Sequence, residues 1–127
     1  MAYEMDVLDI SLLANTDLSA YQYHFVKLTA DNTVDICGAG EQAIGILQNK
    51  PSVAGQAARV RVFGVSRFVN GTAGAIAYGV KVKSDGDGHG VAATSNKDIY
   101  FGIVLDGVAA VNLLGTMLIT GVNSLSA

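Results

Sequence analysis

The 127-residue sequence has no tryptophan, a single proline, Pro51, and a single cysteine, Cys37. One cysteine cannot form an intramolecular disulfide, and with only two histidines it supplies too few ligands for a structural zinc site. Charged residues are also scarce, at 15% of the chain against about 25% in an average soluble domain. A chain of this size buries about two thirds of its surface on folding. We therefore expect one domain with large uncharged surfaces, some of which contact another subunit.

The N-terminal region lacks the basic residues of a secretory signal. The first cation is Lys27, and four acidic residues precede the β-rich part of the chain. Residues 107–127 carry no charge, but Gly, Asn and Thr interrupt this stretch and no Lys or Arg flanks it. The sequence predicts a protein made and kept in a cytoplasm-like compartment, without a membrane-spanning helix.

The composition changes at Gly38. All 15 glycines and Pro51 lie in the last 90 positions. Residues 1–35 hold six acids and one lysine, whereas the remainder holds seven cations and five acids. We expect the two parts to attract each other, within one subunit or between subunits.

From residue 21 onward the apolar residues alternate with others in short runs, which is typical of β-strands. The main runs cover residues 23–28, 33–36, 59–63, 80–83, 99–105 and 116–120. In the run 99–105, alternate residues from Ile99 to Leu105 are expected to share one face. Turn residues separate most runs by ten to fifteen positions, which leaves no room for crossover helices. This spacing favours a mainly antiparallel small barrel or sandwich.

The stretch before this β region fits either a strand or a helical stripe. We expect an extended arm, because no turn signal joins it to a neighbouring strand. Its apolar residues Val7, Leu8, Ile10 and Leu12 are then expected to pair with another chain. The predicted organisation is an N-terminal arm over residues 1–16 and a single β domain over residues 17–127.

Three residues are candidates for catalysis: Cys37, His24 and His89. Cys37 ends an apolar run, where a free cysteine is usually a small buried hydrophobic residue. His24 is the polar member of a strand and His89 lies in a glycine-rich turn, so both are expected at the surface or at an interface. Because no nucleophile, base and orienting group come together, the sequence predicts no enzyme activity.

The segment DGDGHG at residues 85–90 resembles a calcium loop only superficially. Such a loop needs several more oxygen ligands, and the next acid is Asp98. The glycines instead favour a tight β-turn in which an aspartate bonds its own backbone. The segment GAG at residues 38–40 has no following Lys-Ser or Lys-Thr pair and is also expected to be a turn. We expect no metal ion and no cofactor.

Arg59, Arg61 and Arg67 lie at positions of equal parity, with Phe63 and Val65 between them. A strand face that binds single-stranded nucleic acid has this composition. However, the whole chain has a net charge of −3, which argues against that function. An arginine row that meets carboxylates of a partner protein is favoured, because guanidinium groups suit interface pairing.

Four segments, in order, resemble the capsid decoration (cement) proteins of tailed phages in the DUF2190-like family. They are residues 17–28 (DLSAYQYHFVKL), 43–51 (AIGILQNKP), 55–65 (GQAARVRVFGV) and 74–85 (GAIAYGVKVKSD). The resemblance covers about residues 17–105. It implies a compact β-rich protein that trimerises outside an icosahedral head, at three-fold or quasi-three-fold positions, and clamps major capsid protein subunits together. It implies no chemistry.

The expected fold is all-β: a small antiparallel β-barrel or sandwich, β-tulip-like, with an extended N-terminal arm. The resemblance implies two partners, the major capsid protein and further copies of the chain, and no nucleic acid, membrane or small-molecule substrate. It places the protein on the outer capsid surface of the virion after synthesis in the host cytoplasm. The candidate capsid or subunit contacts are Val7, Leu8, Ile10, Leu12, Arg59, Arg61, Phe63 and Arg67. The alternative is a β-barrel module that binds carbohydrate or single-stranded nucleic acid.

Overall fold

The computed structural model describes residues 6–72 and 74–124, and this part of the chain is built from β-strands and loops. The strands are β1 (Leu8–Ala14), β2 (Phe25–Ala30), β3 (Thr33–Ile36), β4 (Gly45–Leu47), β5 (Ala57–Val69), β6 (Lys81–Ser84), β7 (Gly90–Ala92), β8 (Ile99–Asp106) and β9 (Leu114–Ser124). The predicted all-β class is confirmed. Within the described ranges, no helix has the length and apolar character needed to cross a membrane.

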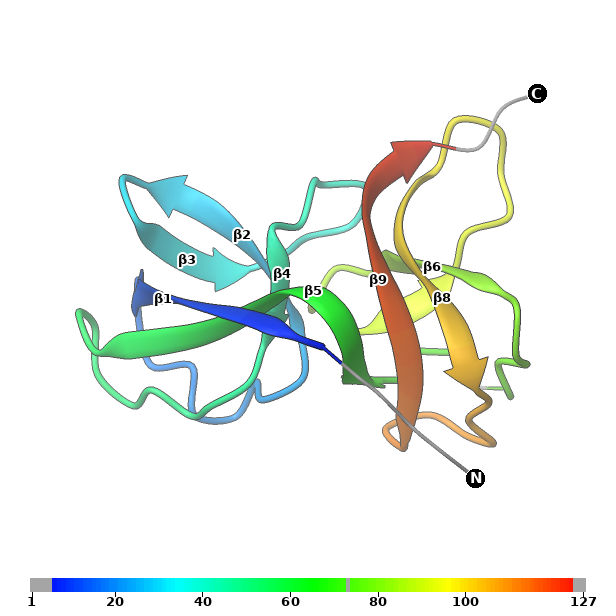
Figure 1. Cartoon of the computed structure of the whole chain (residues 1–127), viewed down its shortest axis with the longest axis horizontal. Coiled ribbons are helices and arrows are strands. Elements are labelled where there is room, and N and C mark those ends of the chain that lie inside the picture. The colour runs from blue at the N-terminus through cyan, green and yellow to red at the C-terminus, as the bar shows by residue number, and fades with distance from the viewer. Residues whose placement is uncertain (1–5, 73, 125–127) are drawn as a thin grey trace.

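The first five strands form a closed barrel. They pair in the order β1-β3-β2-β4-β5, and β5 closes the barrel by pairing with β1. All of these pairs are antiparallel except β1 with β3, which is parallel. The long strand β5 then leaves the barrel and joins a second sheet in the order β5-β9-β8-β6-β7. Figure 1 shows the barrel on one side, β9, β8 and β6 on the other, and β5 passing between them.

The N-terminal segment belongs to the barrel of its own chain. Residues 8–14 form β1, which pairs with β5 over six positions and with β3 over two. The prediction that these residues pair with another chain is therefore wrong for β1. No turn signal joins β1 to a neighbour because both of its partner strands, β3 and β5, lie further along the chain and not directly after it. The first five residues of the predicted arm lie outside the described part.

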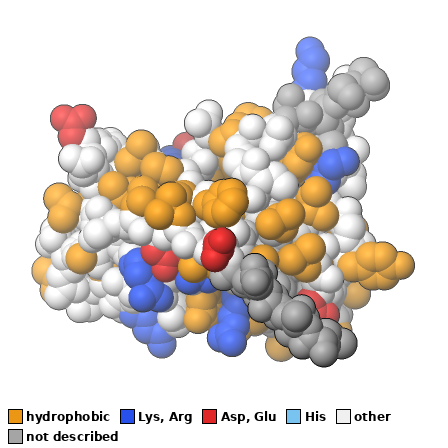
Figure 2. Space-filling view, in the orientation of Figure 1, with side chains coloured by type: hydrophobic (Ala, Val, Ile, Leu, Met, Phe, Trp, Pro, Cys, Tyr) orange, Lys and Arg blue, Asp and Glu red, His pale blue; other side chains and the backbone are white. Residues whose placement is uncertain are grey.

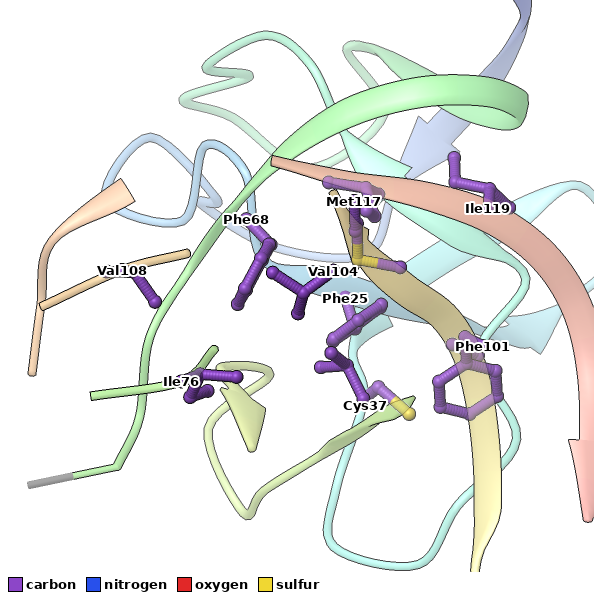
Figure 3. Close-up of a cluster of buried hydrophobic side chains, with 12 residues drawn as sticks. Phe25, Cys37, Phe68, Ile76, Phe101, Val104, Val108, Met117 and Ile119 are labelled. Atoms are coloured by element: carbon purple, nitrogen blue, oxygen red, sulfur yellow. The ribbon is translucent and has the colours of Figure 1, made fainter. Parts of the chain in front are cut away.

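Two hydrophobic cores stabilise the molecule. One fills the barrel and includes Leu18, Val26, Val34, Leu47 and Val60. The other lies between the barrel and the second sheet and is shown in Figure 3, where Phe25, Phe68, Phe101, Val104 and Met117 converge. The neighbours Phe25 and Val26 point to opposite faces of β2, so one residue enters each core and the two cores are joined through this strand.

Strand β8 does not keep the predicted alternation. Its register with β9 shifts between Tyr100 and Gly102 and again between Val104 and Asp106. Such bulges change which side chains face the core. Phe101 and Val104 are both buried, whereas Leu105 is 49% exposed. The expectation that Phe101 and Leu105 share one face is therefore wrong.

Gly64 marks the point where β5 passes from the barrel to the second sheet. Residues up to Phe63 pair with β1, and residues from Gly64 onward pair with β9. Gly64 has a φ of +98°, and a Cβ atom there would lie 2.4 Å from the backbone oxygen of Asp6. Only glycine tolerates both the positive φ and the close approach, so this residue makes the bend possible.

Candidate interaction surface

The outward face of β5 carries the arginine row that the sequence singled out. Arg59, Phe63 and Arg67 are exposed there, whereas Arg61 is half-buried. The Arg67 guanidinium lies 5.8 Å from the centre of the Tyr23 ring, a distance at which a cation attracts an aromatic face. The strand β5 therefore carries all four predicted residues, but these differ in exposure and in their contacts.

Arg61 is engaged by a carboxylate of its own chain. Its Nε donates to Asp9 Oδ1 at 2.7 Å, and its Nη2 donates to Asp9 Oδ2 at 3.2 Å. Its Nη1 also donates to the Val65 carbonyl at 3.0 Å, which spans the bend at Gly64. Arg59 Nε lies 3.3 Å from the same carboxylate. The predicted attraction between the acidic N-terminal part and the basic remainder thus occurs within one subunit.

This pairing has a clear electrostatic effect. The hydrogen bond from Arg61 is the main cause that lowers the pKa of Asp9, and the positive charges of Arg61 and Arg59 act in the same direction. Burial of the carboxyl opposes them. Asp9 is therefore ionised at neutral pH and neutralises much of the arginine row. The expected carboxylate partner of Arg61 comes from β1 of the same chain.

Beside the arginine row lies an exposed apolar surface. Phe63 is 59% exposed and lies opposite Leu8, which is 53% exposed. The register of β1 and β5 shifts between Leu8 and Asp9, and both side chains are left exposed at this bulge. Val7 adjoins them, because its side chain packs against Gly64.

The surface continues onto the second sheet through one row of cross-strand partners. Val65 of β5 lies opposite Leu118 of β9, which lies opposite Ile103 of β8. We call these residues together the apolar outer face: Val7, Leu8, Phe63, Val65, Ile103 and Leu118. Figure 2 shows hydrophobic side chains in a band across the molecule, with a group of Lys and Arg side chains below it on the left and others at the upper right.

The other two N-terminal candidates point inward. Ile10 and Leu12 lie on the inward face of β1 and pack against the barrel core. Leu8 has the same parity, but the register with β5 shifts between Leu8 and Asp9, and Leu8 is exposed. The structure therefore brings Val7 and Leu8 together with Phe63, and it separates them from Ile10 and Leu12. Val65 lies on the arginine face, as its parity predicts, whereas the surface positions of Ile103 and Leu118 were not predicted. For Leu118 the available signal was alternation, which places it on the opposite face of its strand from Met117 and Ile119, both of which are buried.

An apolar groove of about 480 Å³ lies between the barrel and the second sheet. Its described lining includes Phe25, Ile46, Phe101, Met117 and Ile119, and every lining residue is uncharged. Such a lining can bind apolar groups, but it offers no acid or base for proton transfer.

The catalytic candidates have structural surroundings. Cys37 is buried, as predicted, and burial raises the pKa of its thiol. His24 is also buried, at 7% exposure, so its predicted surface position is wrong. The 85–90 segment forms the predicted turn, in which Asp85 Oδ1 accepts from the backbone N–H groups of Asp87 and His89. Among the described residues, no cluster of three or more His, Cys, Asp or Glu could hold a metal ion.

Comparison with known proteins decides the family. A sequence model described as phage cement protein matches residues 5–120. The chain belongs to the phage cement protein family. The resemblance drawn from the four sequence segments is confirmed, and the match also includes β1 and the first part of β9, up to residue 120. Cement proteins are structural proteins, so this member of the family is not an enzyme.

The fold of this cement protein also occurs in a solved structure of a phage head protein. The structure titled "The crystal structure of head fiber gp8.5 N base in bacteriophage phi29" is similar with a TM-score of 0.65 and 15% sequence identity. The similarity covers 91% of this chain and 95% of that one. It therefore includes both the barrel and the second sheet. A search of curated proteins found no match.

Proposed function

We propose that this cement protein attaches as a trimer to the outer surface of an icosahedral phage head and stabilises contacts between major capsid protein subunits. The family assignment supports a role in the capsid. The observation that carries the proposal further is the pairing of two large, exposed apolar side chains, Phe63 and Leu8. Exposed apolar patches of this kind mark protein interaction sites.

The apolar outer face is proposed to be buried in the assembled head, against the major capsid protein or a neighbouring copy. Specific association commonly buries about 1,600 Å² in total, with an apolar centre and a polar rim. The apolar outer face supplies such a centre, and exposed Arg59 and Arg67 lie beside it. Three linked copies gain affinity because binding of the first raises the effective concentration of the others.

Engagement of Arg61 by Asp9 weakens the alternative of a nucleic-acid reader. A groove that follows a phosphate backbone needs cations that are free to neutralise it. Asp9 contacts two members of the arginine row, and its carboxylate faces the same side. The outward face of β5 therefore suits a protein partner better than a polyanion.

The test is binding to heads that lack the protein, followed by sedimentation of the particles. Phe63→Ser removes a large side chain from the apolar outer face, and Val53→Ser is the matched control in the loop before β5. Val53 is 58% exposed, almost the same as Phe63. We expect the Phe63 variant to lose at least about tenfold in affinity for heads, equivalent to about 1.4 kcal/mol, while the Val53 variant binds normally. Equal binding of both variants would contradict this assignment.

The same samples test the oligomeric state. Analytical ultracentrifugation of the free protein at micromolar concentration is expected to show a trimer. If Phe63→Ser dissociates the trimer, the apolar outer face joins copies to one another. If the trimer persists but head binding is lost, the face contacts the shell. A protein that is monomeric both free and on heads would contradict the proposed trimer.

A further inference from the structure

The turn at residues 85–90 is attached to the barrel by a backbone contact. The N–H of Phe25 donates to the carbonyl of Gly88 at 2.8 Å. Gly88 has a φ of +78°, and a Cβ atom there would lie 2.8 Å from both Ile36 Cγ2 and the Phe25 oxygen. The glycine therefore allows the turn to lie directly against β2 and β3. This contact joins the barrel to the β6–β7 hairpin.

His24 lies at this junction, beside the residue that makes the backbone contact. Its Nδ1 lies 2.9 Å from the backbone oxygen of Asp87. Because a carbonyl oxygen only accepts, Nδ1 carries the hydrogen, and a second proton must enter at Nε2. The ring centre lies 4.6 Å from that of His89 and 5.2 Å from that of Tyr21. The imidazole is thus enclosed by the turn on one side and by its own segment on the other.

The charged groups around His24 come mainly from the turn. Asp85, Asp87 and His89 act on its ring, and the segment before β2 contributes the Tyr21 ring. On the barrel side, Leu47 of β4 contacts the His24 backbone and Ile36 of β3 contacts Gly88; neither side chain is titratable. Within the turn, His89 Nδ1 lies 3.2 Å from Asp85 Oδ2.

We propose that protonation of His24 releases the 85–90 turn from the barrel, so that the contact between barrel and β6–β7 hairpin is held at neutral pH and loosened in mild acid. This inference goes beyond attachment to a head and does not depend on it. Protonation would place a positive charge on a buried ring that lies beside His89. Opening of the turn would expose the ring to water, where the charge is solvated.

The direction of the pKa supports this mechanism. Burial is the largest cause and lowers the pKa of His24, and the charge of His89 adds to it. The hydrogen bond to Asp87 and the carboxylates of Asp85 and Asp87 oppose these effects without cancelling them. A histidine with a lowered pKa stabilises the docked state fully above the value of the open state, about 6.5. This stabilisation is lost progressively as the pH falls below that value.

Proton linkage sets the size of the effect. Between about pH 6.5 and the lower pKa of the docked state, each unit of pH favours the open turn by up to about tenfold. Asp85 keeps its bonds to the backbone N–H groups of Asp87 and His89. Because these bonds lie within the turn, we expect the turn to keep its conformation when it separates from the barrel.

The test is amide hydrogen exchange by NMR on the full chain, from pH 7.5 to pH 5. The Phe25 amide reports on the contact, and the Leu13 amide, which donates to the Asn32 carbonyl within the barrel, is the internal control. After correction for the intrinsic pH dependence of exchange, protection of Phe25 should fall progressively below about pH 6.5, while protection of Leu13 stays constant. An equal fall at both amides, or no fall at Phe25, would overturn the proposal.

Two variants identify the responsible group. His24→Asn keeps a side-chain donor near the Nδ1 position but cannot titrate, so Phe25 protection should become independent of pH. His89→Asn leaves His24 able to titrate and should retain a smaller pH dependence, since one cause of the lowered pKa is gone. The imidazole signals of the unmodified protein provide a measurement without substitution: a His24 pKa at or above about 6.5, or a full pH response in His24→Asn, would refute the mechanism.

Discussion

Asp9 and Arg61 lie directly opposite each other on β1 and β5, and their side chains form a two-point ion pair with distances of 2.7 and 3.2 Å. Arg61 also donates to the Val65 carbonyl beyond the bend in β5. One guanidinium therefore fixes the strand that closes the barrel and the bend that leads into the second sheet. The apolar outer face, with Leu8 and Phe63 next to this pair, depends on both.

Replacing Asp9 by Asn should destabilise the protein. The substitution removes the charge that Arg61 and Arg59 share and leaves Arg61 half-buried without its carboxylate. We expect the free energy of unfolding in urea to fall by about 1 to 3 kcal/mol. Asp106→Asn, at an exposed position on β8, is the matched control and should change it by less than about 0.5 kcal/mol. Similar values for the two variants would show that the pair contributes little.

The same pair predicts a dependence on acid pH. The folded state lowers the pKa of Asp9 below the value of about 3.9 in an unfolded chain. Its stabilising contribution is therefore present above that value and is lost as the pH falls through the lower folded pKa. Unfolding of the unmodified protein and of Asp9→Asn should differ most near neutral pH and converge below about pH 4. A difference that stays constant down to pH 2 would contradict the assignment.

Gly64→Ala tests the bend in β5. An added methyl group would meet the Asp6 backbone oxygen at 2.4 Å, and alanine would have to adopt a φ of +98°. We expect the midpoint of urea unfolding to decrease, with a loss of at least about 2 kcal/mol. Gly74→Ala is the control, because a Cβ atom there has open space. Equal stability of the two variants would show that the bend does not require glycine.

Removal of β1 should disrupt the barrel. Deleting residues 2–16 takes away the strand that pairs with β3 and β5, so the truncated chain should lose cooperative thermal unfolding. A milder version compares Leu12→Ala, which affects a side chain packed on the barrel core, with Ser11→Ala on the outer side. We expect a loss of about 1 to 3 kcal/mol for the former and little change for the latter. If the truncated protein folds, β1 is not required for the barrel, and the predicted division into an arm and a β domain would be supported.

Asn70 is a buried polar residue that directly follows β5. Its side-chain amide donates to the carbonyls of Gly74 and Ala110, each at 3.0 Å, and its oxygen accepts from the Thr72 N–H at 2.8 Å. Asn70→Ala would leave these groups without partners and should cost about 2 to 4 kcal/mol in chemical unfolding. Asn96→Ala, at an exposed loop position, should have almost no effect. A neutral Asn70→Ala would mean that water replaces the lost bonds.

Features that depend on short-range sequence were predictable. Alternation identified β3 at its observed bounds, Thr33–Ile36, and glycine spacing identified the turn at residues 85–90. The charge difference between the N-terminal part and the remainder anticipated an attraction, but not its pairing of Asp9 with Arg61. The family resemblance came from four short segments in order, and the wider match to residues 5–120 confirms it.

Features created by tertiary contacts were not predictable. The turn that buries His24 lies 63 residues later in the chain, so no local pattern indicates the burial. The bulges in β8 come from its fit to β9 and reverse the expected orientation of Leu105. Parity gave the outward positions of β5, but only the neighbouring β1 shows that Phe63 stays exposed while Arg61 is paired.

The most direct test of the proposed function is a cryo-electron microscopy reconstruction of phage heads with and without this protein. We expect added density on the outside of the shell, at three-fold or quasi-three-fold positions. A trimer of the barrel and second sheet should fit that density with the apolar outer face buried. Heads that show no external density, or density in which Phe63 and Leu8 face solvent, would contradict it.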